Sequence, residues 1–305
     1  MTTKLADVAI LMATYNGSNW IIPQLSSIRS QIQCSYHLYV RDDGSTDRTK
    51  DLINEAAKSD LNIFIMDSCD ISTGGAASNF LLMLSNINEE NYDYISFSDQ
   101  DDIWFPEKLR MAIDCIVANG ADAYSSNLIA YDNYSIKAWF VEKGGAVCDY
   151  DYIFQGASAG CTYVLTSQTV TKIKLVMGDV IKKFPSEFSH DWTVYAICRS
   201  HGLKWIHDVR SFIAYRQHKS NLYGAKPGFL GLYSKLKRVG DGWYRRHILF
   251  LEKFISGQGK ELHIMKSIRD KTISDRFFLM YNIFSFRRNY MDVIRIGLLV
   301  VFGVL

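Results

Sequence analysis

The sequence VAILMA at residues 8–13 is followed at once by the polar residues TYNG at 14–17. A continuous apolar run of this length is typical of a strand that is buried on both faces of a parallel sheet. Similar runs occur at residues 38–40, 63–66 and 94–97, and helical spacing separates them at 21–32, 47–58 and 80–84. Strands that alternate with helices predict an α/β fold, with a mainly parallel sheet and helices on both faces.

The ends of the predicted strands carry polar, small or acidic residues. Ligands bind beyond the carboxyl ends of the strands in such a sheet, which places residues 14–17, 42–45, 74–75 and 99–104 on one rim. Carboxylates are concentrated at two of these strand ends, where a merely solvated loop would not need them. An ordinary set of polar loops is the alternative, and we favour a ligand site.

The segment Asp99-Gln100-Asp101-Asp102 holds three carboxylates at the end of an apolar strand. Carboxylate oxygens suit Mg²⁺ or Mn²⁺, usually with substrate phosphates completing the ligand shell. Such an ion could neutralise a leaving diphosphate. The alternative is a cap for a helix that begins near Pro106. One aspartate would suffice for a cap, and clustered carboxylates repel each other unless a cation neutralises them, so we favour a metal site.

Three motifs occur in order along the chain: ATYNG at 13–17, RDDGSTD at 41–47, and DQDDIW at 99–104 with PEKL at 106–109. Together they resemble glycosyltransferase family 2, which has the GT-A fold, a Rossmann-like nucleotide-binding architecture. The resemblance covers about residues 5–225. With HDW at 190–192 and YRQH at 215–218, it favours the rhamnosyltransferase-like branch, whose members build bacterial O-antigen, capsule or other cell-surface polysaccharides.

The resemblance implies donor contacts in the first two motifs and in a glycine loop. The loop of Thr14, Tyr15 and Asn16 would hold the nucleotide. Asp42 would accept a hydrogen bond from the pyrimidine N3–H, with Asp43 beside it. The segment at 73–80 resembles the family's donor loop, which adds Gly75 and Asn79 as donor contacts because glycine permits close backbone approach.

The resemblance also implies a diphosphate and metal site. Asp99 and Asp101 match the family's DXD motif and would contact the donor ribose and the metal-bound diphosphate, with Gln100 between them. His218 would be a further metal or diphosphate ligand, with Arg216 nearby as a donor contact. A cluster of basic and polar groups after a strand suits that role, whereas a lone structural histidine is the alternative.

Asp191 is the candidate general base that the resemblance implies. Inverting transfer needs one carboxylate that removes the proton of the acceptor hydroxyl. The segment SHDW at 189–192 begins a predicted helix that ends near Gly202, and a helix start favours an ionised carboxylate. The alternative is that Ser189 or Asp191 is only the helix N-cap. The role of His190 stays open between orienting a substrate and a structural histidine.

The acceptor side is implied by the segment QGASAGCT at 155–162, which resembles the family's small-residue loop. The candidate acceptor contacts are Gly160, Cys161, Thr162, His190 and Trp192. No acyl-transfer setting surrounds Cys161, so we interpret its thiol as structural.

The predicted reaction is metal-dependent, inverting transfer of a hexose or deoxyhexose from a nucleoside diphosphate to a sugar hydroxyl. The branch resemblance favours dTDP-L-rhamnose as donor and a glycan on a polyprenyl diphosphate as acceptor. The alternatives are the same fold with UDP-galactose, UDP-glucose or a UDP-N-acetylhexosamine, and a non-catalytic carbohydrate-binding or scaffold protein. A nucleotidyltransferase would be expected to carry a glycine-rich, lysine-containing phosphate loop, and residues 14–17 are not one.

Charge is unevenly distributed along the 305 residues. Residues 1–225, the predicted catalytic domain, carry 19 Lys and Arg against 26 Asp and Glu, whereas residues 226–305 carry 15 against 6. After about Pro227, helical spacing with interleaved basic and aromatic residues leads to an apolar end at 296–305, which is shorter than the roughly 20 residues that span a bilayer. This predicts a helical extension that contacts a membrane surface, or else a helical cap on the sheet. No motif indicates nucleic-acid binding.

The six cysteines form no CxxC pair, and the first seven residues lack the pattern of a signal peptide. We therefore expect free, mostly buried thiols in a cytoplasmic protein that lies peripherally on the inner face of the membrane. An oligomer is possible, and the sequence does not fix its size.

Overall fold

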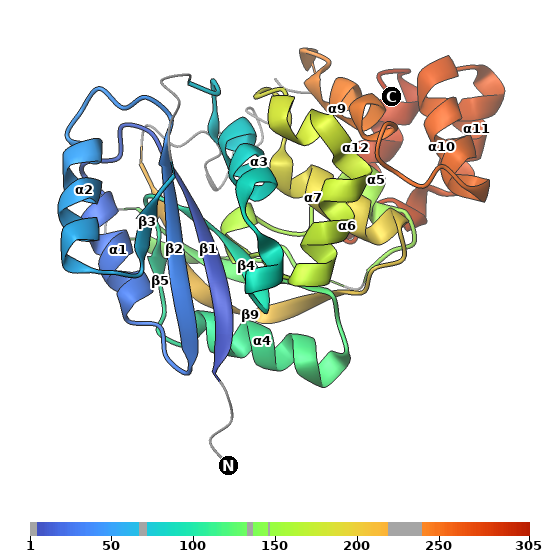
Figure 1. Ribbon diagram of the computed structural model, residues 1–305. Coiled ribbons are helices and arrows are strands. Elements are labelled where there is room, and N and C mark those ends of the chain that lie inside the picture. The colour runs from blue at the N-terminus through green and yellow to red at the C-terminus, as the bar shows by residue number, and fades with distance from the viewer. Residues whose placement is uncertain (1–4, 67–71, 133–136, 146, 219–239) are drawn as a thin grey trace.

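The structure is a computed structural model that describes residues 5–66, 72–132, 137–145, 147–218 and 240–305 (Figure 1). Within these residues the strands form one nine-stranded sheet. The sheet has a parallel part, built by the first four strands, and a mixed part, built by the remaining five.

The parallel part has the strand order β3-β2-β1-β4. Its strands are β1 Ala6–Thr14, β2 Cys34–Asp42, β3 Ile63–Ile65 and β4 Tyr94–Asp99, and the elements between them are α1 Ile21–Arg29, α2 Thr49–Ser59, α3 Ala76–Asn86 and η1 Glu89–Asn91. The apolar run predicted at residues 8–13 lies in the centre of the sheet. In the register Thr14 pairs with Asp42, and Ala13 pairs with Asp99. The carboxyl ends of β1, β2 and β4 therefore meet at one rim, as predicted.

The mixed part continues beyond β4 in the order β8-β6-β9-β5, with β7 paired to β6. Its elements are β5 Ile103–Trp104, α4 Lys108–Asn119, β6 Ala123–Asp132, β7 Lys137–Val141, α5 Asp151–Phe154, η2 Gly160–Thr162, β8 Val164–Thr166, α6 Ser167–Met177, η3 Gly178–Lys183, α7 His190–Ser200 and β9 Trp205–Gln217. β8 is antiparallel to both β4 and β6, and β5 is antiparallel to β9. The α/β fold is confirmed, and the apolar runs did not predict the antiparallel strands because run length alone carries no direction.

Two hydrophobic cores cover the two faces of the sheet. Alternate residues of β1 point to opposite sides, so Ala9 and Leu11 belong to one core and Val8 and Ile10 to the other. The first core is covered by α3, α5, α6 and α7, and the second by α1, α2 and α4. The predicted helices on both faces are therefore present.

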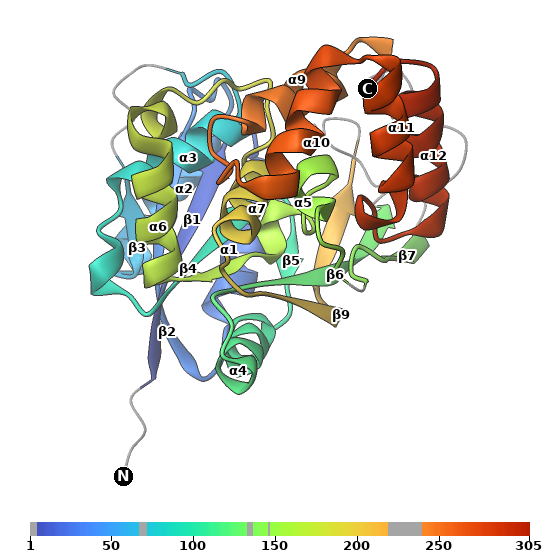
Figure 2. The ribbon, with the colours of Figure 1, turned by 90° about the vertical axis from the view of Figure 1, so that its right-hand side faces the viewer.

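The C-terminal part is helical, as predicted, and comprises α9 Trp243–Leu251, α10 Gly259–Asp270, α11 Ile273–Tyr281, η4 Ile283–Ser285 and α12 Tyr290–Val301 (Figure 2). These helices share the first core with the sheet. The ring of Phe286 stacks on Phe154 of α5 at 4.3 Å between centroids, and Ile248 of α9 is fully buried. The part of the tail prediction that concerns residues 226–239 lies outside the described residues.

Two further expectations can be compared with the structure. Cys161 and Cys198 are buried free thiols, and Cys34 and Cys115 are half-buried free thiols. In the described part of the chain, no helix combines the length and the hydrophobicity that crossing a membrane requires.

Candidate active site

The carboxylate of Asp42 ties the ends of β1 and β2 together. Its Oδ2 accepts a hydrogen bond from the Thr14 hydroxyl at 2.9 Å and its Oδ1 from the Ser45 amide at 2.7 Å. The ammonium of Lys50 lies 3.8 Å from the same carboxylate. Asp42 is thus at the rim, as predicted, but its oxygens already bind the turn that follows β2. Its contact with a pyrimidine ring stays a prediction.

The turn after β1 is joined to the Asp99–Asp102 segment through Gln100. The Tyr15 amide donates to Gln100 Oε1 at 3.0 Å, and Gln100 Nε2 donates to the Tyr15 carbonyl at 2.9 Å. A Cβ on Gly17 would lie 2.1 Å from Gln100 Oε1, so alanine there would displace the Gln100 side chain. Asn16 has a left-handed backbone, with φ of 47°, and its side chain accepts from the Thr46 amide at 2.8 Å. Tyr15, Asn16 and Gln100 therefore form one rigid wall of the rim.

Asp43 and Asn79 lie on the buried side of the predicted donor loop at 73–80 and bond to it and to Arg41. Asp43 Oδ1 accepts from the Thr73 amide at 2.6 Å and from Arg41 at 3.2 Å. Asn79 is 1% exposed, and its amide group bonds both the guanidinium and the carbonyl of Arg41, at 2.8 and 3.1 Å. Gly75 precedes α3, where an added Cβ would lie 3.1 Å from Ser186 Cβ. The structure places Asp43 and Asn79 behind the loop, where they shape it.

The carboxylates after β4 are desolvated and close to one another. Desolvation raises the pKa of Asp99 to about 7, and the neighbouring charges of Asp101 and Asp191 act in the same direction. Asp102 is fully buried, and burial, with the charges of Asp101 and Asp99, raises its pKa well above the usual range. Asp102 Oδ1 accepts from the Arg216 amide at 3.3 Å, whereas its Oδ2 has no hydrogen-bond partner among the described residues.

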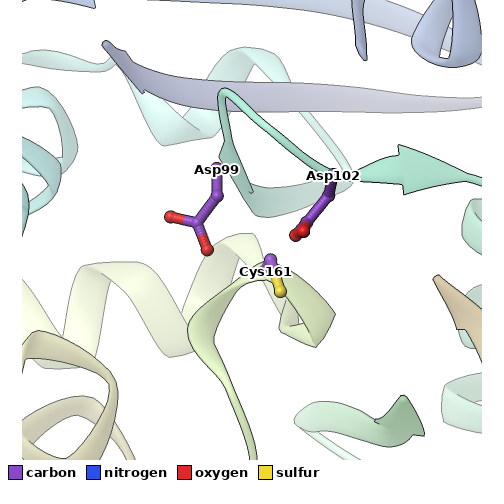
Figure 3. Close-up of side chains that lie close together, drawn as sticks. All are labelled: Asp99, Asp102 and Cys161. Atoms are coloured by element: carbon purple, nitrogen blue, oxygen red, sulfur yellow. The ribbon is translucent and has the colours of Figure 1, made fainter. Parts of the chain in front are cut away.

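Cys161 lies between two of these carboxylates (Figure 3). One donor atom from each of Asp99, Asp102 and Cys161 falls within 4.8 Å of the others. Burial, and then the charges of Asp102 and Asp99, raise the pKa of the thiol well above its usual value. A protonated thiol is a poor ligand for Mg²⁺ or Mn²⁺, which prefer oxygen. Cys161 therefore suits a structural thiol, as the sequence indicated, better than a ligand of a hard cation.

Asp101 meets His218 across 117 positions of sequence. His218 Nε2 lies 2.8 Å from Asp101 Oδ2, and the imidazole stacks on the ring of Trp20 at 5.0 Å. Arg216 donates from Nε to the Asp101 carbonyl at 2.8 Å, and its guanidinium lies 4.8 Å from the Trp20 ring and 5.0 Å from the Tyr131 ring. The antiparallel pairing of β5 with β9 brings the two segments together. The sequence-predicted set Asp101, Arg216 and His218 is thus adjacent.

The rim offers the kinds of donor atom that a divalent cation accepts. Asp99 and Asp101 carry carboxylate oxygens and His218 an imidazole nitrogen, whereas the three donors that lie within 4.8 Å of one another among the described residues come from Asp99, Asp102 and Cys161. Burial, and then the charges of Asp101 and Asp99, raise the pKa of Asp102, and a cation bound nearby would lower the cost of ionising these carboxyl groups. Lys108 is buried near these carboxyl groups, with its ammonium 3.4 Å from the centre of the Trp104 ring and 3.0 Å from the Ser96 hydroxyl. Burial lowers the pKa of Lys108 to about 7. It therefore supplies only part of the compensating charge.

Asp191 begins α7 beside this cluster. Ser189 caps the helix by accepting from the Trp192 amide at 3.3 Å, and Asp191 Oδ1 accepts from the same amide at 2.7 Å and from the Ser189 hydroxyl. Asp191 is half-buried and close enough for its charge to raise the pKa of Asp99. The capping alternative therefore describes real contacts, and it leaves the second carboxylate oxygen, Oδ2, available for a substrate.

The candidate acceptor residues divide into two groups. A Cβ on Gly160 would lie 2.7 Å from His190 Nε2 and 3.3 Å from Asp191 Cβ, so η2 lies directly against the start of α7. The imidazole of His190 packs on Phe80, and burial lowers its pKa, so it is neutral at pH 7. Thr162 and Trp192 are instead buried in the core. Their donors bond the carbonyls of Ala159 and Tyr152, both at 2.8 Å.

One buried charge network escaped the sequence analysis. Asp151 is fully buried in α5 and accepts from Tyr195 at 2.9 Å and from Arg199 at 3.1 Å. Arg288, which precedes α12, lies 3.0 Å from the same carboxylate and donates to the Ala157 carbonyl at 3.2 Å. Neither Asp151 nor Arg288 belongs to a motif that the sequence singles out. Their separation of 137 positions left no local signal of the pair.

The chain is similar to known glycosyltransferases in both sequence and fold. Residues 9–155 match the model of the family described as Glycosyl transferase family 2. The dTDP-rhamnosyl transferase RfbG of Shigella flexneri is 38% identical over 78% of this chain and 82% of that protein. The UDP-Glc:alpha-D-GlcNAc-diphosphoundecaprenol beta-1,3-glucosyltransferase WfgD of Escherichia coli is 28% identical over 53% of this chain and 61% of its own length. The crystal structure of S. aureus TarS 1-349 with UDP-GlcNAc has a similar fold, with a TM-score of 0.61 at 15% identity over 97% of this chain and 81% of that chain.

Proposed function

The chain belongs to glycosyltransferase family 2, and on this basis we propose that it transfers L-rhamnose, with inversion, from dTDP-L-rhamnose to a saccharide hydroxyl. The observation that carries the choice of donor is the similarity to the dTDP-rhamnosyl transferase of Shigella flexneri, which extends over most of both chains. The chemistry of the rim supports the reaction type, because Asp191 lies close enough to the carboxylates after β4 for its charge to raise the pKa of Asp99.

The donor diphosphate is assigned to the Asp99–Asp101–His218 side of the rim. A Mn²⁺ or Mg²⁺ ion held by these three residues would neutralise the charge that develops on the leaving diphosphate. Arg216 adds a fixed positive charge beside that site, because its guanidinium is held between aromatic rings and the Asp101 carbonyl. The nucleoside is assigned to the wall of Thr14, Tyr15 and Asn16 and to the turn at Asp42.

Asp191 is assigned as the general base. Its carboxylate takes the proton of the acceptor hydroxyl while that oxygen forms a bond to the anomeric carbon and the bond from this carbon to the diphosphate breaks. The start of α7 stabilises the ionised carboxylate, because the Trp192 amide donates to it at 2.7 Å. Gly160 and His190 border the space next to Asp191, where we assign the acceptor hydroxyl. Since His190 is neutral, it can accept or donate a hydrogen bond there without competing for the proton.

The acceptor is assigned as a glycan on a polyprenyl diphosphate, in the synthesis of an O-antigen, capsule or related cell-surface polysaccharide. The name of the Escherichia coli relative, which acts on a diphosphoundecaprenol-linked sugar, supports this class. Within this proposal residues 1–225 carry the transfer chemistry at the inner face of the cell membrane, and residues 226–305 contact the membrane surface.

Calorimetric titration with dTDP-L-rhamnose, UDP-galactose, UDP-glucose and UDP-N-acetylglucosamine, each with Mn²⁺ and with EDTA, tests the donor assignment. We expect tight binding of dTDP-L-rhamnose with Mn²⁺ and at least tenfold weaker binding with EDTA. Asp101→Asn should remove that difference, whereas Asp114→Asn, an exposed control on α4, should keep it. Preference for a UDP-sugar would replace the donor, and transfer that survives EDTA unchanged would contradict the metal.

The alternative from another class is a non-catalytic carbohydrate-binding or scaffold protein. Release of dTDP from dTDP-L-rhamnose on addition of an acceptor would exclude it. The anomeric configuration of the product, read from its NMR coupling constants, then decides between inversion and retention. A folded protein that binds sugars but releases no nucleotide from any donor would favour the scaffold.

A further inference from the structure

The C-terminal helices expose an unusual number of large apolar side chains. We call the exposed side of α11, η4 and α12 the apolar face. It comprises Ile273, Phe277, Tyr281, Phe284, Tyr290, Met291, Ile294, Leu298, Val301 and Phe302, which are 42% to 88% exposed. A contiguous apolar surface of this kind on a folded protein marks an interaction site.

The exposed apolar residues of the apolar face recur at helical spacing, so they form continuous stripes along α11 and α12. On α11 the exposed residues Ile273, Phe277 and Tyr281 follow each other at intervals of four. The other side of α12 is buried, through Val293, Ile296 and Val300. The exposed stripe of α12 follows the same rule, with residues 290, 294, 298 and 302 at intervals of four. Each helix therefore has one apolar side in the core and a second apolar side in solvent.

The two helices lie side by side, so their stripes join (Figure 2). Gly297 of α12 packs against Met280 of α11, where an added Cβ would be 3.7 Å from Met280 Cε. At the other end, Lys271 Nζ donates to the Gly303 carbonyl at 2.9 Å, and Arg276 donates to the Val301 carbonyl at 3.4 Å. The start of α11 thus lies beside the end of α12, and the pair is fixed in place.

The residue types on the apolar face match a lipid surface. Its aromatic side chains, Phe277, Tyr281, Phe284, Tyr290 and Phe302, are of the kind that accumulates at membrane interfaces. Apart from the buried Arg288, residues 271–305 carry four Lys and Arg against two Asp, which favours contact with anionic headgroups. A second copy fits less well, because a twofold dimer through this face would bring two positively charged regions together.

We propose that the apolar face is a lipid-docking surface, which inserts into the headgroup region of an anionic bilayer and holds the rim at the membrane. This rests on the proposed function, whose acceptor is lipid-linked. Figure 1 shows α9–α12 at the end of the molecule toward which β1 runs, and the rim lies at that end of β1. α12 has 12 residues, fewer than the roughly 20 that span a bilayer, which is consistent with lying in the interface.

The test is co-sedimentation of the full chain with vesicles of phosphatidylglycerol and phosphatidylethanolamine, and with vesicles of phosphatidylcholine alone. We expect binding to the anionic vesicles, reduced at least tenfold by the double variant Phe277→Ser with Phe302→Ser, whose positions are 73% and 75% exposed. The matched control is Leu61→Ser with Leu175→Ser, which removes side chains that are 91% and 75% exposed elsewhere on the surface. Arg295→Glu should weaken binding to anionic vesicles only.

Three results would overturn the proposal. These are equal vesicle binding by the wild type and the Phe277/Phe302 variant, no binding by the wild type, and a stable dimer in solution that the same variant makes monomeric. Donor binding, measured by calorimetry, is expected to be unchanged in this variant. Loss of vesicle binding with donor binding intact therefore concerns the apolar face alone, whereas failure to bind any nucleotide-sugar would concern the proposed function.

Discussion

The rim buries ionisable side chains, whereas the apolar face exposes hydrophobic surface. Asp102 is fully buried with one carboxyl oxygen that lacks a hydrogen-bond partner in the described part of the chain, and Phe277 is 73% exposed on α11. Each arrangement is unfavourable for the isolated chain, since a buried polar atom needs a partner and exposed apolar area needs covering. We therefore propose that each region is complementary to a different partner. The rim suits a cation with a diphosphate, and the apolar face suits lipid.

The largest effect is expected at the rim, where one carboxylate can be neutralised without changing its shape. Asp191→Asn should lower the rate of transfer by about 10²–10⁴-fold, because the amide cannot take the acceptor proton. Donor affinity should hardly change. The melting temperature should also stay close to that of the wild type, because the amide oxygen can still accept from the Trp192 amide. Single-turnover kinetics with labelled donor, together with calorimetry, measure the two quantities separately.

Asp149→Asn is the matched control, because Asp149 is an exposed aspartate just before α5 and lies outside the predicted site. Its rate should equal that of the wild type. Full activity of Asp191→Asn would remove the base from the rim. The ionisable side chains of the rim would then serve to bind the donor, and none of them would act as the base.

A second prediction concerns a buried charge that belongs to the C-terminal part. Arg288→Ala should lower the free energy of unfolding by about 2–3 kcal/mol, because Asp151 is fully buried and would keep Arg199 as its one cationic partner among the described residues. Arg295→Ala, which removes a half-exposed partner of Asp292, should change it by about 1 kcal/mol or less. Urea unfolding of both variants measures the difference. Equal effects would mean that burial does not distinguish the two arginines.

The polar groups at the strand ends could be predicted because they lie where apolar runs stop. Thr14, Asp42 and Asp99 end three strands of the parallel part, so their proximity follows from strand direction alone. The burial of Trp192 could not be predicted in this way. Its ring faces the core because α9 covers it, with the His247 imidazole 4.3 Å away, and no local pattern links the two segments.

The C-terminal helices show a different limit. The sequence indicated a helical tail with net positive charge, and the structure adds the exposed apolar side, which charge counting did not reveal. Both sides of α12 are apolar, so periodicity could not tell that Val293 and Ile296 face the core while Ile294 and Leu298 face solvent. That choice depends on α11 and η4, which contact one side of α12, while the other side stays uncovered within the part of the chain that the structure describes.

A third prediction uses the pH dependence of stability to test the contact between α9 and α7. His247 of α9 lies against Trp192 and Trp243, and burial lowers its pKa to about 3. In the unfolded chain the imidazole binds its proton near pH 6.5, so the unfolded state gains protons first as the pH falls. The contribution of His247 to stability is therefore complete above about pH 6.5. It is lost below that, at about 1.4 kcal/mol per pH unit, until the pH nears 3.

Urea unfolding between pH 7 and pH 5 measures this slope. His247→Gln, whose amide can still accept from the Ser189 backbone, should reduce the slope by about one proton. His201→Gln is the control, because His201 directly follows α7 and its ring bonds the Phe254 carbonyl at 3.0 Å. An unchanged slope in His247→Gln would mean that α9 already separates from α7 before the chain unfolds. The tail would then be a detachable lipid-docking part and not a portion of the catalytic core.

The smallest effect is expected from the scaffold of the rim, in a cycle of Gly17→Ala and Gln100→Ala. Gln100→Ala removes two hydrogen bonds to the Tyr15 backbone and should lower the free energy of unfolding by about 1 kcal/mol. Gly17→Ala should cost about the same, because its Cβ would displace the Gln100 side chain, and Gly17 has no positive φ that alanine would strain. In the Gln100→Ala background it should cost nothing, since the obstructing atom is gone, and alanine there reduces the freedom of the unfolded chain. Additive costs would mean that glycine is needed at position 17 for another reason, namely that the donor or a neighbouring backbone segment lies close to it. In that case donor affinity, measured by calorimetry, should fall in both backgrounds.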